Sequence, residues 1–361
     1  MFLRQSRSKR RAVAEHLPAR DRNDASLKRK LLPPLGENPV KVLVVIVNYR
    51  TPGLTIDCLE SLAAAGGLPT DTRVVVTDNA SGDDSCSRIQ AAIDEHGWSK
   101  WARLMPLARN GGFAYGNNEA IRPALLASDR PDYVLLLNSD TRVHAGAIQT
   151  LVDFLERNPK AGMVGSRLED PDGTSQFSTF RFPSLWSELD ESLRLGPVHR
   201  LLKKHVTLVP TPSEAAEVDW VAGASLLIRR EVFDTIGLLD DGYFLYYEET
   251  DFCLRAARAG FSCWYEPKSR VMHLVGQSTG VTVRNQAMPR RPKYWFDSRR
   301  RYFLRNHGRA FTMLLDAVWA ATYPFGRLQL KLRRKPVFDP SRLWLDYVKN
   351  SVFCRGFGLS R

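Results

Sequence analysis

The stretch VLVVIVNYRTP, residues 42–52, decides the fold class of this 361-residue chain. Its first six residues are all aliphatic, which is typical of a strand covered on both faces, and Asn48 begins a polar turn. A helical pattern then continues to about Ala65. Further strands, each followed by a helix, are predicted at 73–77, near Leu104 and at 133–137. These repeated strand and helix units predict an α/β fold with a mainly parallel sheet flanked by helices.

Polar or glycine residues follow each predicted strand. In chain order they are Asn48, Asp78, the turn Asn110-Gly111-Gly112 and the turn Asn138-Ser139-Asp140. Ligands of such sheets bind beyond the carboxyl ends of the strands. Each group also has a structural explanation, because Asn, Asp and Gly stabilise turns and helix starts. Their common position at one sheet edge nevertheless favours a ligand site there.

The usual phosphate-binding loops are absent from the sequence. No GxGxxG follows the first strand and no GxxxxGK[ST] is present, which argues against a dinucleotide oxidoreductase and a P-loop NTPase. A ligand that carries phosphate therefore needs another anchor. Asp140 can provide one through Mg²⁺ or Mn²⁺, since hard oxygen ligands hold these ions while the ion binds phosphate oxygens.

A cluster of carboxylates lies in the second half of the chain. The aromatic stretch 243–247 leads into Glu248, Glu249 and Asp251, which fall in the first turn of a short helix. Acidic residues at a helix N-terminus interact favourably with the helix dipole, so the cluster has a structural explanation as well as a catalytic one. Strands are predicted at 263–265 and 271–273. His273 ends the second, where a hydrogen-bonded structural role is the commoner alternative to metal binding.

Charge is distributed unevenly along the chain. Because the whole chain has a net charge of +13, with +6 in residues 1–40 and +14 in residues 284–361, residues 41–283 carry −7. We expect a disordered basic arm at 1–40, a globular domain at 41–283 and a basic helical extension at 284–361. The basic flanks suit nucleic acid or an anionic membrane surface.

Cysteine spacing and hydropathy bear on the compartment. The five cysteines have no CxxC spacing, which favours a reducing compartment over a disulfide framework or a zinc site. The N-terminus lacks the apolar core of a signal peptide, and we expect the chain to stay on the cytoplasmic side. The most apolar stretch, residues 310–326, is interrupted by Asp316 and Pro324. It is predicted to be either a core helix or a segment in a membrane interface.

Taken in order, these motifs resemble glycosyltransferase family 2, which has the GT-A fold, and within it the bacterial rhamnosyltransferase-like branch that builds cell-surface polysaccharides. The resemblance covers about 240 residues. It rests on VVIVNYRTP at 44–52, VVVTDNAS at 74–81, ARNGGFAYGNNEAI at 108–121, YVLLLNSDTRV at 133–143, WVAGASLLIRREVFDTIGLLD at 220–240, FLYYEETDFCLRAARAGF at 244–261, and His273.

The resemblance implies a role for each matching position. Asp78 is expected to contact the base or ribose of a nucleotide-sugar, and Asn138-Ser139-Asp140 occupies the family's DXD position, with the weaker ligand Asn in place of the first Asp. Asp140 and His273, with Asn138, are the implied metal ligands for Mg²⁺ or Mn²⁺. The implied nucleotide-sugar site comprises Asn48, Tyr49, Asp78, Asn110, Gly111, Gly112, Asn138 and Asp140.

The same resemblance implies that Glu249 is the catalytic base. Glu248 and Asp251 are expected to shape its surroundings. Their like charge should raise the pKa of Glu249, while Arg255 should offset part of this effect. A base that takes a proton from the acceptor hydroxyl, with a metal that neutralises the departing diphosphate, is sufficient for inverting transfer.

The resemblance therefore predicts an inverting, metal-dependent transferase that moves a rhamnose-like sugar. The implied donor is dTDP-rhamnose or a UDP-sugar, and the implied acceptor is a glycan or a polyprenyl-diphosphate-linked sugar. Such an enzyme works at the inner face of the cell membrane, next to an anionic lipid surface, without a nucleic-acid partner. The alternatives are a nucleic-acid-binding protein that uses its basic flanks, and a domain that binds a sugar nucleotide without turning it over, suggested by Asn138.

Overall fold

A computed structural model describes residues 40–64, 68–69, 71–274 and 289–359. The predicted arm at 1–40 lies outside these residues apart from Val40. The boundary predicted at 283/284 also lies outside them, so that division of the chain stays a prediction.

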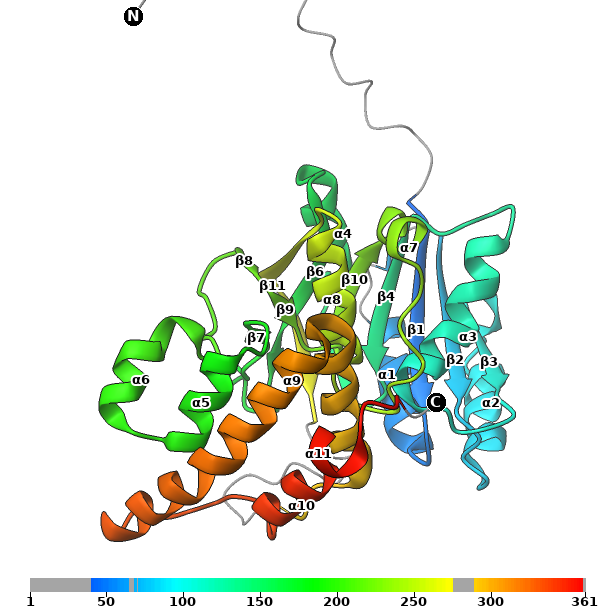
Figure 1. Cartoon of the computed structure of the whole chain (residues 1–361). Coiled ribbons are helices and arrows are strands. Elements are labelled where there is room, and N and C mark those ends of the chain that lie inside the picture. The colour runs from blue at the N-terminus through cyan, green and yellow to red at the C-terminus, as the bar shows by residue number, and fades with distance from the viewer. Residues whose placement is uncertain (1–39, 65–67, 70, 275–288, 360–361) are drawn as a thin grey trace, which may run out of the picture. The chain divides into compact units, whose positions relative to one another are not determined.

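The first four strands form the predicted parallel array (Figure 1). Their order in the sheet is β3-β2-β1-β4, and all three pairings between them are parallel. Register aligns their carboxyl ends, since Asn48 pairs with Asp78 and Val47 with Asn138. The strands are β1 (Val42–Asn48), β2 (Thr72–Asp78), β3 (Ala102–Pro106) and β4 (Tyr133–Asn138), and the helices that follow are α1 (Pro52–Ala64), α2 (Ser85–Glu95), α3 (Gly112–Leu126) and α4 (Ala147–Arg157).

Beyond β4 the sheet becomes mixed. Strand β10 (Ser225–Arg229) runs antiparallel between β4 and β6 (Ala161–Glu169). Strand β11 (Ser262–His273) is parallel to β6 and antiparallel to β5 (Thr141–Val143) and β8 (Ala216–Val218). The strands predicted at 263–265 and 271–273 are thus one strand, because its irregularity between Glu266 and Arg270 does not end the pairing. A separate pair joins β7 (Thr179–Phe180) to β9 (Trp220–Val221).

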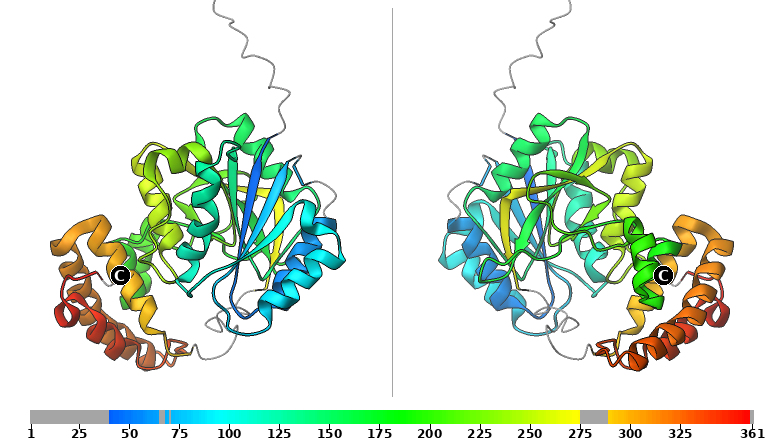
Figure 2. Two further views of the ribbon diagram at one scale, coloured as in Figure 1. Left: turned by 90° about the vertical axis from the view of Figure 1, so that its right-hand side faces the viewer. Right: turned by 90° about the vertical axis from the view of Figure 1, so that its left-hand side faces the viewer.

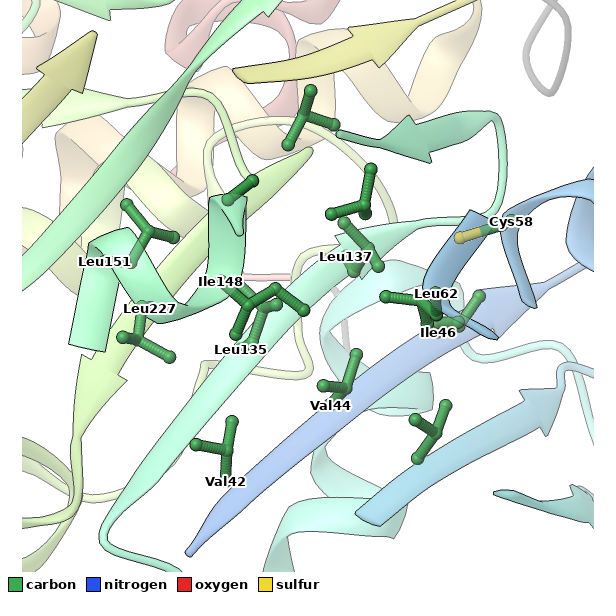
Figure 3. Packing of buried hydrophobic residues seen from close by; sticks show 14 of the residues in the cluster. Val42, Val44, Ile46, Cys58, Leu62, Leu135, Leu137, Ile148, Leu151 and Leu227 are labelled. Carbon is green, nitrogen blue, oxygen red and sulfur yellow. The ribbon is translucent and has the colours of Figure 1, made fainter. Parts of the chain in front are cut away.

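Alternate side chains of the central strands pack on opposite faces of the sheet, as strand geometry requires. Figure 3 shows one face, where Ile46 and Leu135 lie among side chains from α1 and α4, including Leu62 and Ile148. On the other face the intervening residues of β1 and β4 join a cluster with α3 and α8 (Glu248–Arg258). Figure 2 shows helices on both sides of the sheet. The α/β fold with covered parallel strands is confirmed.

The C-terminal region is helical, as predicted, and lies on the side of the sheet away from α1 and α2 (Figure 2). Helix α9 (Lys293–Leu332) has a break at Gly308, where φ is 83°. Its residues Tyr302 and Phe303 pack against Tyr243 and Leu254 of the preceding region. Among the described residues, no helix has the length and apolar character needed to cross a membrane. The other helices are α5 (Leu185–Leu193), α6 (Gly196–Leu202), α7 (Arg230–Ile236), α10 (Leu343–Asn350) and α11 (Val352–Arg355).

A buried charge network holds α5, α9 and α10 together. The Arg299 guanidinium of α9 donates to Glu188 Oε2 of α5 at 2.7 Å and to Asp316 Oδ1 at 2.8 Å. Tyr347 of α10 donates its hydroxyl to the same Asp316 oxygen at 3.2 Å. Loss of one partner would leave a buried charge unpaired, so this network fixes which face of α9 points inward.

Candidate functional site

A cavity of about 300 Å³ lies at the carboxyl ends of β1 and β4, where the sequence predicted a ligand site. Most of the predicted site residues line it: Tyr49, Asn110, Gly112, Asn138, Asp140, Glu248, Glu249 and His273. The predicted residues Asn48, Asp78, Gly111 and Asp251 do not line it. Gly223, just before β10, also lines the cavity.

Asn48 and Asp78 form a buried pair that braces the sheet edge. The Asn48 side-chain amide donates to Asp78 Oδ2 at 2.7 Å, and the Ser81 hydroxyl donates to the same oxygen at 2.6 Å. The backbone N–H of Ser81 donates to Asp78 Oδ1 at 3.0 Å. Asp78 is 2% exposed and both of its oxygens accept hydrogen bonds from the protein, so in this structure it braces the sheet edge, and its contact with a nucleotide stays a prediction.

The Gly111-Gly112 turn joins the start of α3 to the loop before Glu248. The Asn79 side chain accepts from the Gly111 N–H at 3.2 Å and donates to the Gly112 carbonyl at 3.0 Å. Gly112 has φ +88°, and a Cβ at this position would lie 1.9 Å from the Phe244 carbonyl oxygen. Only glycine fits there. Sequence reasoning missed Asn79, although it directly follows Asp78 in the TDNAS stretch.

Asp140 and His273 meet because β5 pairs with β11, which places Thr141 opposite His273. Asp140 Oδ1 lies 3.4 Å from His273 Nε2. On the other side of the imidazole ring, His273 Nδ1 lies 3.2 Å from Gln176 Oε1, while Gln176 Nε2 donates to the His273 carbonyl at 2.7 Å. Since Oε1 can only accept, Nδ1 donates to it, and in the neutral ring Nε2 is then the nitrogen that carries the lone pair. No sequence signal identified Gln176.

These donors fit a divalent cation. A carboxylate oxygen and an imidazole nitrogen face the same cavity, and the amide of Asn138 lines it too. Within the described ranges, no three His, Cys, Asp or Glu side chains gather as a complete protein cage. A cation held by Asp140 and His273 would therefore take further oxygen ligands from water or from phosphate, as Mg²⁺ and Mn²⁺ commonly do.

Glu248 and Glu249 begin α8 after two residues of left-handed backbone, Tyr246 and Tyr247, each with φ 70°. Among the described residues, the Oε2 atoms of both glutamates are buried without a hydrogen-bond partner. Burial raises the pKa of Glu248 well above its ordinary value, and the charge of Glu249 raises it further. Burial also raises the pKa of Glu249, against the opposing effect of nearby backbone N–H groups.

Asp251 does not take part in this site, in contrast to its predicted place beside the base. Two residues along a helix correspond to a rotation of about 200°, so Asp251 points away from Glu249. Its carboxylate accepts from Arg255 Nε at 2.8 Å, the Tyr243 hydroxyl at 3.2 Å and Asn306 Nδ2 at 2.7 Å. The Arg255 side chain is therefore paired with Asp251. The raised pKa of Glu249 comes from burial and not from repulsion by Asp251.

Comparison with known proteins agrees with this geometry. A sequence model of the family described as "Glycosyltransferase like family 2" matches residues 39–290. The chain is 32% identical over 256 residues to the N-acetylglucosaminyl-diphospho-decaprenol L-rhamnosyltransferase of Mycobacterium tuberculosis, covering 66% of this chain and 78% of that protein. It is 31% identical over 239 residues to the rhamnosyltransferase WbbL of Escherichia coli, covering 64% and 83% respectively.

A solved structure shows the same fold. The mannosyltransferase PcManGT from Pyrobaculum calidifontis, in complex with GDP-Man and Mn²⁺, superposes with a TM-score of 0.52 at 15% identity, covering 82% of this chain and 76% of that one. The predicted GT-A architecture is thereby confirmed. The family match also favours the enzyme hypothesis over the nucleic-acid-binding alternative. This chain belongs to glycosyltransferase-like family 2 and is a nucleotide-sugar-dependent glycosyltransferase.

Proposed function

We propose that this enzyme transfers a rhamnose-like sugar, with inversion, from a nucleotide-diphosphate sugar to a hydroxyl group of a glycan or a lipid-linked acceptor. The main support is that one cavity contains both the Glu249 carboxylate and the Asp140–His273 pair. A proton acceptor and a cation site are the two elements that such a transfer requires.

Glu249 is the proposed base. Its carboxylate lines the cavity and has a buried oxygen with no hydrogen-bond partner among the described residues, so the lone pairs of that oxygen are not engaged by the protein and could accept the proton of the acceptor hydroxyl. Its raised pKa increases its affinity for the proton that the hydroxyl loses as it attacks the anomeric carbon. Burial and the charge of Glu249 raise the pKa of Glu248 well above its ordinary value, which favours a proton on Glu248 and the negative charge on Glu249.

Asp140 and His273 are the proposed ligands of Mg²⁺ or Mn²⁺, with Asn138 as a weaker neutral ligand. A bound cation would neutralise the negative charge that develops on the departing nucleoside diphosphate. Gln176 orients His273 through both ring and backbone, so that Nε2 faces Asp140 before any ligand arrives. The presence of Glu249 together with Asp140 and His273 argues against a domain that binds the donor without turnover.

The nucleotide is proposed to lie against Tyr49 and Asn110, which line the cavity beside the ends of β1 and β3. Asn48 and Asp78 then act as positioning residues, since their side chains hold the sheet edge on which these groups stand. Gly112 contributes by allowing close approach of backbone to ligand and to Phe244. This arrangement is compatible with dTDP-rhamnose or a UDP-sugar.

The acceptor is proposed to be linked to a polyprenyl diphosphate. This rests on the similarity to the mycobacterial relative, whose name gives N-acetylglucosaminyl-diphospho-decaprenol as its acceptor. The enzyme would then act in cell-surface polysaccharide synthesis at the cytoplasmic face of the membrane.

The direct test is sugar transfer to polyprenyl-diphosphate-linked N-acetylglucosamine, with dTDP-rhamnose and UDP-sugars compared as donors and the product's anomeric configuration read by NMR. The proposal predicts transfer from one donor, dependence on a divalent cation, and a product configuration opposite to the donor's. Retention of configuration, or full activity in EDTA, would show that the proposed mechanism is wrong.

A further inference from the structure

Helix α9 presents a continuous apolar stripe to solvent along its second half. The stripe consists of residues at helical spacing on one face, which are Leu314, Ala317, Ala321, Phe325, Leu328 and Leu332. Each is exposed, with Leu328 54% and Leu332 76% accessible. An apolar face of this length is unusual on the surface of a monomeric protein, where exposed apolar residues are normally scattered.

The stripe cannot turn inward, because the opposite face of α9 is fixed. Trp319 stacks on Tyr347 of α10 with ring centroids 3.6 Å apart, and Thr322 hydrogen-bonds Ser192 of α5 at 2.6 Å. A Cβ at Gly326 would lie 2.1 Å from the Ser192 carbonyl oxygen, which shows how closely α5 and α9 approach. The exposure of the stripe is therefore a fixed property of the fold.

Positive charge lies at the C-terminal end of the stripe. Lys331, Arg333, Arg334 and Lys335 are all exposed. The sole acidic residue between positions 310 and 335 is Asp316, which is buried and paired with Arg299. The stripe and its end thus combine apolar side chains with basic side chains for which the described part of the chain offers no acidic residue between 317 and 335. A second copy of this chain would bring the same positive charge to the interface.

A tryptophan borders the same helix. The Trp344 indole N–H donates to the Ala320 carbonyl of α9 at 2.9 Å, and the side chain remains 38% exposed. Tryptophan with a satisfied N–H and an exposed ring is typical of the boundary between headgroups and acyl chains. The stripe is about 27 Å long at 1.5 Å per residue, but only one face of the helix is apolar, so the helix suits a position in the membrane plane.

We propose that this stripe, with the basic cluster at 331–335, is a docking surface for an anionic lipid bilayer, in which the part of α9 after Gly308 lies parallel to the membrane with its apolar side chains at the boundary between headgroups and acyl chains. The inference goes beyond the sugar-transfer reaction and does not depend on which sugar or acceptor the enzyme uses. Near its other end, α9 borders the cavity, where Tyr294 packs against Phe244 with ring centroids 5.3 Å apart. The part of α9 before the break at Gly308 thus contacts a residue of the cavity wall, and the part after the break carries the docking surface.

The test is co-sedimentation of the full-length protein with vesicles of phosphatidylcholine alone or with about 30% phosphatidylglycerol, at about 0.15 M salt. The unmodified protein should bind the anionic vesicles. The double variant Phe325→Ser/Leu332→Ser should bind them at least about tenfold more weakly. The variant Lys331→Glu/Arg334→Glu should lose the preference for phosphatidylglycerol.

A matched control removes two exposed leucines elsewhere. Leu126→Ser/Leu208→Ser, at positions 81% and 52% exposed, should leave vesicle binding unchanged. All variants change solvent-exposed side chains, and unchanged melting temperatures would establish that they fold. Equal binding by Phe325→Ser/Leu332→Ser and the unmodified protein would overturn the proposal.

Sedimentation velocity tests whether a second copy of this chain, and not a bilayer, covers the stripe. A dimer that Phe325→Ser/Leu332→Ser dissociates, together with no vesicle binding, would also overturn the proposal. Binding of the nucleotide-sugar donor is measured separately on the same samples. If only the docking proposal is wrong, the protein binds the donor but not the vesicles. If only the proposed function is wrong, the protein binds the vesicles but not the donor.

Discussion

The Oδ1 atom of Asp140 lies 3.4 Å from Nε2 of His273, although 132 residues separate them in the chain. The strand pairing that places Thr141 opposite His273 creates this proximity. Because Gln176 donates to the His273 carbonyl and accepts from Nδ1, the ring is oriented without any ligand. A preoriented carboxylate and imidazole would support the proposed cation binding at a site that lacks the first Asp of the DXD motif.

Gln176→Leu should weaken Mn²⁺ binding about 10- to 100-fold, because the change frees the imidazole ring and removes the acceptor that keeps Nδ1 protonated. The measurement is donor affinity as a function of Mn²⁺ concentration. Transfer at saturating Mn²⁺ should recover. Gln90→Leu is the control, since Gln90 is exposed and its side chain donates to Asp94 in its own helix. Unchanged Mn²⁺ dependence in Gln176→Leu would show that Gln176 does not position His273.

Glu249→Gln should reduce transfer by at least about a thousandfold while donor affinity stays within a few-fold, because the amide cannot accept the acceptor's proton. The rate of the unmodified enzyme should fall as pH decreases through the pKa of Glu249. Burial raises this pKa above its ordinary value of 4.5, so the midpoint of the acid limb should lie above 4.5. Substantial turnover by Glu249→Gln would place the base elsewhere.

Glu248→Gln should stabilise the protein at neutral and alkaline pH. A carboxyl group with a raised pKa binds its proton more tightly in the folded state than in the unfolded state. Its contribution to stability is therefore complete below the pKa of the unfolded state and is lost as the pH rises through the pKa of the folded state. The melting temperature should rise by about 1 to 3 °C at pH 8, with the difference from the unmodified protein narrowing toward pH 4. A lower melting temperature at pH 8 would contradict this.

Gly112→Ala should destabilise the fold by more than about 3 kcal/mol and abolish transfer, because the new Cβ would collide with the Phe244 carbonyl in addition to straining the backbone. Gly146→Ala is the matched control. Its φ is +74°, yet a Cβ there meets nothing within 4 Å, so only the backbone cost of about 1 kcal/mol applies. Urea unfolding measures both; equal losses would show that contact with Phe244 is unimportant.

Local patterns in the sequence were sufficient to predict the parallel half of the sheet and most of the cavity lining. The strand at 42–47 and the polar turn after it are determined by residues adjacent in the chain, so the sequence pattern reveals both. Parallel pairing then brings the carboxyl ends of such strands to one edge of the sheet. The prediction that Glu248, Glu249 and Asp251 lie in the first turn of a helix is confirmed, because a helix start also depends on residues adjacent in the chain.

Contacts between distant segments account for the residues that sequence reasoning misplaced or missed. Asp251 points away from the cavity, where it meets Asn306, 55 residues later. Gln176 lies in an irregular segment whose path depends on β11, 97 residues away. The paired state of Asp78 also depends on Asn48, 30 residues earlier, and leaves no trace in periodicity.

The most direct test of the central claim is a thermal-shift titration with dTDP-rhamnose, UDP-sugars and GDP-sugars, each in Mn²⁺ and in EDTA, on the unmodified protein and on Asp140→Asn. A ligand that binds the native state raises the melting temperature by mass action. The account predicts a Mn²⁺-dependent rise with one nucleotide-sugar, which Asp140→Asn abolishes. An equal rise in EDTA, or a rise that Asp140→Asn leaves unchanged, would contradict the assignment of Asp140 and His273 as the cation site.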